Sequence, residues 1–340
     1  MKVGVTYDLR HEYLTAGYTE EETAEFDGVE TIDALVSALQ ALGHAPYRIG
    51  NVHQLAARLV GGERWDLVFN MAEGLHGVAR EAQVPALLDA YELSYTFSDP
   101  LVLALALHKG LTKHVVRSLG IPTPDFAVVD TQADLKAVAL PWPVIAKPVA
   151  EGTSKGISGA NKVWSRAALE AVCSTLLNRF QQPVLVETFL PGRELTVGIV
   201  GTGTRARALG VMEVFLQAEA EPEVYSYANK VGYASRVRYG LVSGTLAEQA
   251  TDLALRVWSG LGCRDGGRVD LRCDAQGLPY FLEVNPLPGL NRDHSDLPIL
   301  CRLLGLPYDA LIRLIMDSAL QRQCASASDR YLTRRMPHQR

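Results

Sequence analysis

Strands and helices are expected to alternate along the first part of the chain, and this alternation limits the fold more than any other feature. The expected elements are, in order, a strand at 2–7, a helix at 31–42, a strand at 46–49, a helix at 52–59, a strand at 66–69 and a helix at 81–91. Successive β-α units imply a mainly parallel sheet with helices on its faces. The N-terminal part is therefore predicted to be α/β.

The second half of the chain has a different pattern. After a helix at 112–119, the two prolines of IPTPDF favour extended chain and mark a junction. Strands separated by glycine-rich turns follow, at 143–148, 159–164, 183–190 and 194–201, with a helix at 165–180. This part is predicted to be α+β. Residues 322–340 are polar and basic with no apolar face, which predicts a frayed tail.

Composition excludes several classes of partner. The formal net charge is -5, which provides no broad basic field for a nucleic acid or an anionic membrane, so the expected partner is a small molecule. No apolar run is long enough to span a membrane, and the N-terminus lacks the apolar stretch of a signal peptide. The cysteines are scattered without a CxxC pair, which argues against a disulfide framework or a zinc site. A cytoplasmic protein is predicted.

The stretch GRVDLRCDAQGLPYFLEVN predicts a β-hairpin, because Asp274 and Gly277 suit the first and last positions of a turn. If the loop is Asp274–Gly277 without a bulge, Asp270 lies opposite Phe281. In the same register, one face of the hairpin carries four polar side chains, Arg268, Asp270, Glu283 and Asn285, with Arg268 opposite Glu283. Leu282 and Val284 then point into the core.

Carboxylate and amide oxygens gathered on this face favour a hard divalent cation such as Mg²⁺. The alternative is a salt bridge between Arg268 and the acidic residues, with no metal.

A glycine-rich loop follows the strand that carries Lys147, in VIAKPVAEGTSKGISG. Glycines let backbone N–H groups approach phosphate oxygens, while hydroxyls and lysines add donors and positive charge. The loop is neither a GxxxxGK[ST] nor a GxGxxG motif, so a flexible surface turn is the alternative.

Five stretches resemble the ATP-grasp superfamily, and specifically the D-alanine–D-alanine ligases. In chain order they are HKGLTK, PVIAKPVAEGTSKGI, VLVETFLPGRELTV, GRVDLRCD and FLEVNPLPG. The resemblance implies an ATP-grasp fold with an N-terminal Rossmann-like domain at 1–108, a central lobe with a lid loop at 109–190, and a C-terminal catalytic lobe at 191–321. The tail occupies 322–340. The two α+β lobes would clamp ATP between them.

The resemblance also implies the activity. The protein would use ATP and Mg²⁺, or Mn²⁺, to form an amide bond between two small amino acids through an acyl phosphate. The family acts in peptidoglycan biosynthesis, and the resemblance further suggests a homodimer.

Site residues follow from the resemblance by position. Nucleotide binding is assigned to Lys109, Lys147, Gly152, Gly156, Glu187, Leu190, Glu194 and Lys230. Metal binding is assigned to Asp270, Glu283 and Asn285. The catalytic set is Arg268, the Gly289 backbone N–H, Thr153 and Ser154, with Arg268 and Gly289 facing the reacting carbonyl oxygen.

The departures from the family cluster on the amino-acid side. Thr153 replaces a serine, and Val231 replaces a tyrosine for which Tyr233 is a substitute. Glu73 stands where the family has a histidine, with His76 nearby. The glutamate that grips the substrate ammonium stays open among Glu21, Glu22 and Glu25, and acceptor binding stays open among Asn291, Arg292, His294 and Ser295.

Three hypotheses remain from the sequence. The first is a ligase for two small amino acids, with D-alanine as the default. The second is an ATP-grasp ligase for another carboxylate and amine, motivated by Glu73 and Val231. The third is a nucleotide-binding regulator without catalysis, which would not require Arg268 and Gly289.

Overall fold

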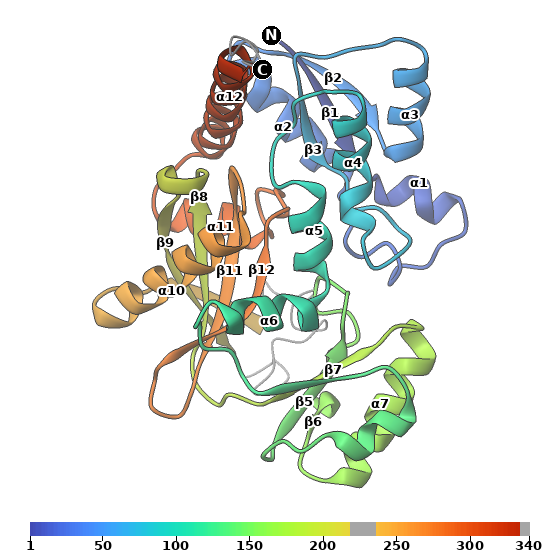
Figure 1. The fold of residues 1–340 in the computed structure, drawn as a ribbon, viewed down its shortest axis with the longest axis vertical. Coiled ribbons are helices and arrows are strands. Elements are labelled where there is room, and N and C mark those ends of the chain that lie inside the picture. The colour runs from blue at the N-terminus through green and yellow to red at the C-terminus, as the bar shows by residue number, and fades with distance from the viewer. Residues whose placement is uncertain (218–235, 334–340) are drawn as a thin grey trace, which may run out of the picture.

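The fold contains three β-sheets in a computed structural model that describes residues 1–217 and 236–333 (Figure 1). The first sheet is parallel, with strand order β2-β1-β3. Its strands are β1 (Lys2–Tyr7), β2 (Ala45–Gly50) and β3 (Leu67–Met71). The accompanying helices are α1 (Arg10–Thr15), α2 (Val29–Ala41), α3 (Val52–Val60) and α4 (Gln83–Ala90). The predicted α/β start is confirmed.

The second sheet is antiparallel, in the order β4-β7-β5-β6. Its strands are β4 (Phe126–Val129), β5 (Val144–Pro148), β6 (Lys162–Val163) and β7 (Val184–Thr188). Helix α7 (Arg166–Phe180) packs on the sheet, where Leu169, Cys173 and Leu176 are buried against apolar strand residues. This sheet presents the ends of β5 and β7 to the candidate site.

The third sheet is antiparallel, in the order β10-β9-β8-β11-β12. Its strands are β8 (Glu194–Val200), β9 (Arg207–Leu216), β10 (Val237–Leu241), β11 (Gly266–Cys273) and β12 (Pro279–Asn285). Helices α10 (Thr245–Leu261) and α11 (Asp296–Leu303) lie on opposite faces, because Val197 packs with α10 while the neighbouring Gly198 faces Leu297 and Leu300. Helices α5 (Pro100–Leu107) and α6 (Lys109–Ser118) join the α10 side. The predicted α+β texture is confirmed, while the domain boundaries at 108, 190 and 321 stay predictions.

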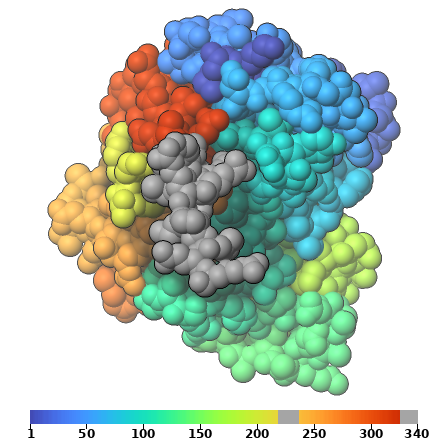
Figure 2. Space-filling model, turned by 45° about the horizontal axis from the view of Figure 1, so that its top comes forward, coloured from blue at the N-terminus to red at the C-terminus, as the bar shows by residue number. Residues whose placement is uncertain are grey.

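Helix α12 (Tyr308–Thr333) returns to the first sheet and packs beside α2. Figure 2 shows the orange-red C-terminal segment against the blue N-terminal part of the surface. The frayed tail predicted from residue 322 is therefore wrong for 322–333, which continue the helix. Arg322 anchors this turn by pairing with the buried Asp265, at 2.6 Å. No helix of the described residues is both long and apolar enough to cross a membrane.

Strands β11 and β12 pair in a different register from the predicted one. Asp270 lies opposite Glu283, and Arg268 lies opposite Asn285. The loop spans Asp274–Leu278, one residue longer than the expected turn, although Asp274 and Gly277 do form the turn hydrogen bond.

A bulge adds a second shift, because Leu271 pairs with Phe281 and leaves Leu282 without an opposite residue. An extra residue in one strand reverses the alternation of side chains beyond it. Phe281 is therefore in the core, and the expectation for Leu282 is wrong, whereas Val284 is buried as predicted. The bulge lets Leu282 and Glu283 both line a cavity.

Candidate active site

Two adjoining cavities lie between the sheets. The large cavity has a volume of about 820 Å³, and the small cavity has a volume of about 100 Å³. Four residues line both of them, Thr153, Arg268, Glu283 and Asp296. A group bound in one cavity can therefore meet a group bound in the other at this shared wall.

Strands β11 and β12 supply the polar face of the shared wall. Arg268 forms an ion pair with Asp270, and its Nε lies 3.6 Å from Oδ2 of Asp296. Asp270 also accepts hydrogen bonds from Thr196 at 2.9 Å and from the Asn285 amide at 3.2 Å. The sequence-derived face is confirmed in its membership, although the opposing pairs differ.

The side chains of this wall offer oxygen atoms of the kind that bind a divalent cation. Burial, together with the neighbouring Glu283 and Asp296, raises the pKa of Asp270 to about 6 despite its contact with Arg268. Two carboxylates directly opposite each other repel, and a bound cation relieves that repulsion. Two carboxylates and one amide match the oxygen ligands that Mg²⁺ prefers. Asp270, Glu283 and Asn285 therefore fit the predicted metal role.

A buried lysine-glutamate-lysine cluster lies at the small cavity. Glu187, on β7, is 2.5 Å from the Lys147 ammonium and 2.9 Å from that of Lys113. Although burial acts to raise it, the two lysines hold the pKa of Glu187 at about 2. Burial lowers the pKa of Lys113 to about 8, while Glu187 opposes that shift. Glu187 is thus a fixed anion at the base of the small cavity.

Leu190 and Glu194 line the same cavity. The Glu194 carboxylate lies 3.1 Å from Arg272, and burial raises its pKa. This apolar and acidic lining, next to the buried lysine, can hold a flat base and hydroxyl groups.

The glycine-rich loop covers the shared wall. Thr153 and Ser154 both have left-handed backbone conformations, with φ of 50° and 56°. Thr153 lines both cavities and Ser154 lines the small one. Gly152 lines the large cavity and donates its N–H to Glu25 at 2.5 Å. Gly156 is outside both linings, and a Cβ there would meet the Phe180 ring at 2.7 Å.

Lys109 and Gly289 belong to the large cavity. The Lys109 ammonium, at the start of α6, lies 3.5 Å from Glu283 and 2.5 Å from the carbonyl oxygen of Glu151. Gly289 lies close to Ser295, whose hydroxyl is 2.8 Å from the position a Cβ would take. Both residues line this cavity together with Glu283, and the roles predicted for them stay predictions.

The sequence left the roles of several residues undecided, and the structure shows which of them line the large cavity. Glu25, Glu73, His294 and Ser295 line the large cavity. Glu21 pairs with Arg179 at the surface, Glu22 bonds to Thr19, and Arg292 is 3.5 Å from Asp309. Asn291 is buried and bonds to Thr31, and His76 lines a different pocket. Lys230, Val231 and Tyr233 lie outside the described residues.

Sequence reasoning missed several residues of the site, namely Arg80, Glu81, Lys113, Lys155, Arg272 and Asp296. Two of these residues could have been found from their spacing in the sequence. Arg272 continues the alternation of Arg268 and Asp270 along β11, and Lys113 lies four residues after Lys109 on one helix face. The other four come from three segments far apart in the chain, with Arg80 and Glu81 adjacent in one of them, so no local spacing indicates them.

A lysine-bearing sheet facing a sheet with paired carboxylates, with a glycine-rich loop over the gap, defines an ATP-grasp enzyme. Comparisons agree with this class. A family model described as D-ala D-ala ligase C-terminus matches residues 115–317. The D-alanine–D-alanine ligase of Bordetella petrii is 32% identical over 94% of this chain and 92% of its own length. That of Aquifex aeolicus is 31% identical over 85% of this chain and 94% of its own.

Solved structures show the same fold. D-alanine–D-alanine ligase from Bacillus anthracis complexed with ATP has a TM-score of 0.71 at 20% identity, covering 96% of this chain and 99% of that chain. The VanG D-Ala:D-Ser ligase from Enterococcus faecalis has a TM-score of 0.72 at 18% identity, covering 94% and 99%. The chain belongs to the D-alanine–D-alanine ligase family and is an ATP-dependent ligase that forms carbon–nitrogen bonds.

Proposed function

We propose that the protein uses ATP and Mg²⁺ to join two amino acids through an acyl phosphate. One observation carries the proposal: Asp270 and Glu283 lie opposite each other on β11 and β12, where Glu283 lines both cavities and Asp270 lines the small one. Paired carboxylates between the small, lysine-lined cavity and the large cavity support phosphoryl transfer to a substrate carboxylate.

Residues of the small cavity, together with Lys109 and Gly152 from the large cavity, take the nucleotide roles. Glu187 and the backbone near Leu190 bind adenine, and Glu194 binds the ribose hydroxyls. Lys109 and Lys147 neutralise phosphate charge, while Gly152, Thr153 and Ser154 close over the phosphates from the loop. Gly156 keeps the loop in its conformation, since its φ is 73°. Lys230 is proposed to contact the nucleotide from its sequence position alone.

The chain's own residues direct two steps. The substrate carboxylate attacks the γ-phosphorus of ATP, ADP leaves, and an acyl phosphate forms. The second substrate's amine then attacks the carbonyl carbon, inorganic phosphate leaves and the amine loses a proton. Arg268 and the Gly289 N–H donate to the developing oxyanion, and such a donor is worth about 3 kcal/mol.

Asp270, Glu283 and Asn285 are the residues that would hold Mg²⁺, or Mn²⁺ in its place. The ion would neutralise charge on the phosphate oxygens during transfer. The raised pKa of Asp270 supports this assignment, because Asp270 and Glu283 need a nearby cation if both are to remain ionised.

D-alanine is the first substrate to test, because similar proteins bear the name D-alanine–D-alanine ligase. Another carboxylate and amine pair is the second candidate, and the observation that favours it is Glu73 in the wall of the large cavity. Family membership also supports a role in the cytoplasm. It further supports a homodimer, and analytical ultracentrifugation would test this oligomeric state.

The test is ADP release in the presence of ATP, Mg²⁺ and a panel of D- and L-amino acids, with products read by mass spectrometry. We expect ADP only when metal and amino acid are both present, and no turnover after EDTA treatment. Glu283→Gln should abolish turnover while circular dichroism stays unchanged, and the exposed Glu170→Gln is the matched control. Full activity of Glu283→Gln, or ADP release without an amino acid, would contradict the proposal.

A further inference from the structure

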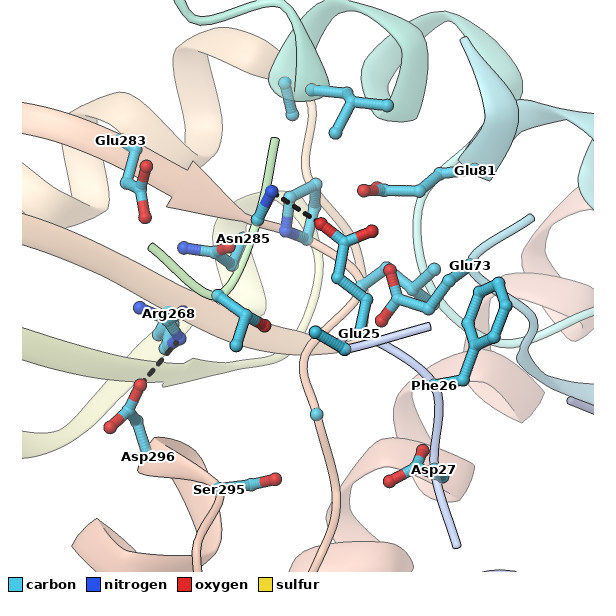
Figure 3. A pocket seen from close by; sticks show the side chains of 18 of the residues that line it. Glu25, Phe26, Asp27, Glu73, Glu81, Arg268, Glu283, Asn285, Ser295 and Asp296 are labelled. Atoms are coloured by element: carbon cyan, nitrogen blue, oxygen red, sulfur yellow. Dashed lines mark hydrogen bonds and ion pairs between the residues drawn. The ribbon is translucent and has the colours of Figure 1, made fainter. Parts of the chain in front are cut away.

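Three carboxylates in the large cavity have no ion-pair partner among the described residues. They are Asp27, Glu73 and Glu81. Figure 3 shows Glu73 and Glu81 directed into the pocket beside Glu25, with Asp27 further along. They come from separate segments, so the tertiary structure gathers them into one acidic wall.

The nearby cations are already used by other carboxylates. Arg80 donates to Glu25 at 2.9 Å and to the carbonyl oxygen of Ala150 at 2.9 Å. Lys155 lies 2.5 Å from Glu151 and 3.5 Å from Glu25. Two cations and two carboxylates thus form a balanced cluster between the first sheet and the glycine-rich loop. Glu25 is committed to this cluster and is not available as the sole partner of a substrate ammonium.

The remaining carboxylates affect each other. Burial raises the pKa of Glu73 well above its usual range, and the charges of Glu81, Glu25 and Asp27 add to the effect. Burial likewise raises the pKa of Glu81 to about 7, although Arg80 opposes it, and that of Asp27 to about 7. Carboxylates withdrawn from water and left without a cation are costly, so a ligand that brings positive charge stabilises them.

We propose that Glu73 and Glu81 bind a cationic group of the substrate, so the large cavity takes an amino compound with a second basic group. This inference rests on the proposed ligase function. The same cavity is lined by Lys109, Arg268 and Glu283, where the reacting carboxylate is placed. A basic amino acid can hold its carboxylate there and extend its side-chain cation to Glu73 and Glu81.

Charge balance distinguishes this substrate from alanine. A zwitterionic alanine brings one ammonium, which can neutralise only one of the three carboxylates. A lysine, ornithine or arginine brings two positive groups, which can pair with two of the three carboxylates. Replacing the side-chain cation by a neutral group leaves half-buried carboxylates unpaired, which selects against the neutral analogue.

The test compares each basic amino acid with a neutral analogue of similar shape, in D and L forms. The pairs are lysine with norleucine, ornithine with norvaline, and arginine with citrulline. Each is assayed alone and together with D-alanine for ADP release and product mass. Calorimetric binding of the same compounds, with a non-hydrolysable ATP analogue and Mg²⁺ present, provides a readout that does not need turnover.

We expect at least one basic amino acid to exceed its neutral analogue about tenfold or more in kcat/KM and in affinity. Glu73→Gln and Glu81→Gln should each reduce this ratio, whereas Glu170→Gln should not. Equal binding and turnover of the basic and neutral partners would overturn the inference while leaving the ligase function intact. Absence of ADP release with every compound would overturn the proposed function, and calorimetry would then decide the charge preference alone.

Discussion

Glu81→Gln is predicted to stabilise the ligand-free protein above neutral pH. The pKa of Glu81 is raised from 4.5 to about 7, with burial as the largest cause and Glu25 and Glu283 adding to it. One pKa unit corresponds to about 1.4 kcal/mol, so the shift is worth up to about 3 kcal/mol. Glutamine keeps the shape of the side chain and removes the charge that causes the cost.

The direction of the pH dependence follows from the raised pKa. As pH rises above about 4.5, the unfolded chain releases the Glu81 proton while the folded protein still holds it. The wild-type protein therefore loses stability up to about pH 7, and the loss is constant above that. The glutamine variant has no such loss, so its advantage should be absent near pH 5 and largest near pH 8.

Thermal unfolding followed by circular dichroism measures the effect. In a chain of this size about 3 kcal/mol corresponds to a few degrees in Tm. We expect Glu81→Gln to have the higher Tm near pH 8, with no gain near pH 5. Adding a basic amino acid that binds should remove the difference, because the ligand stabilises only the carboxylate form. A gain that is equal at both pH values, or a lower Tm near pH 8, would refute the reasoning.

Three further predictions concern other parts of the structure. Asp265→Asn should lower the free energy of unfolding by about 3–5 kcal/mol in urea titration, because the buried carboxylate pairs with Arg322; a loss below about 1 kcal/mol would contradict this. Lys113→Met should raise the KM for ATP more than it lowers kcat, because Glu187 loses one of its two cations; an unchanged KM would count against that role. Gly267→Ala should destabilise the protein by about 1–3 kcal/mol, since its Cβ would lie 2.4 Å from the Asn285 carbonyl oxygen; unchanged stability would show that the strands adjust freely.

The β11–β12 hairpin shows which structural features can be predicted from local sequence patterns. The turn at Asp274 and the polar face of β11 follow from residue types and alternation, and both are confirmed. The bulge at Leu282 was missed, because a bulge depends on how Phe281 and Val284 fit the core beneath the sheet. The two carboxylates proposed to bind the metal ion were nevertheless placed on one face, since Asp270 and Glu283 share a face in either register.

The acidic wall of the large cavity illustrates the opposite case. Glu73 is visible in the sequence only as an unusual residue in a motif, and Glu81 has no local signal. Among the residues that the structure describes, the two carboxylates lack a cation because Arg80 and Lys155 already pair with Glu25 and Glu151. These pairs form only where three segments of the chain meet in the folded protein.

The sequence alone determined the β-α start, the α+β texture of the rest of the chain and the family, because these depend on periodicity and on short motifs. The tertiary structure decided that α12 returns to α2 and that Lys113 reaches Glu187. It also decided which carboxylates of the large cavity have cations beside them. Those features depend on contacts between residues far apart in the chain, and neither hydrophobic spacing nor turn chemistry contains information about which distant charges become neighbours.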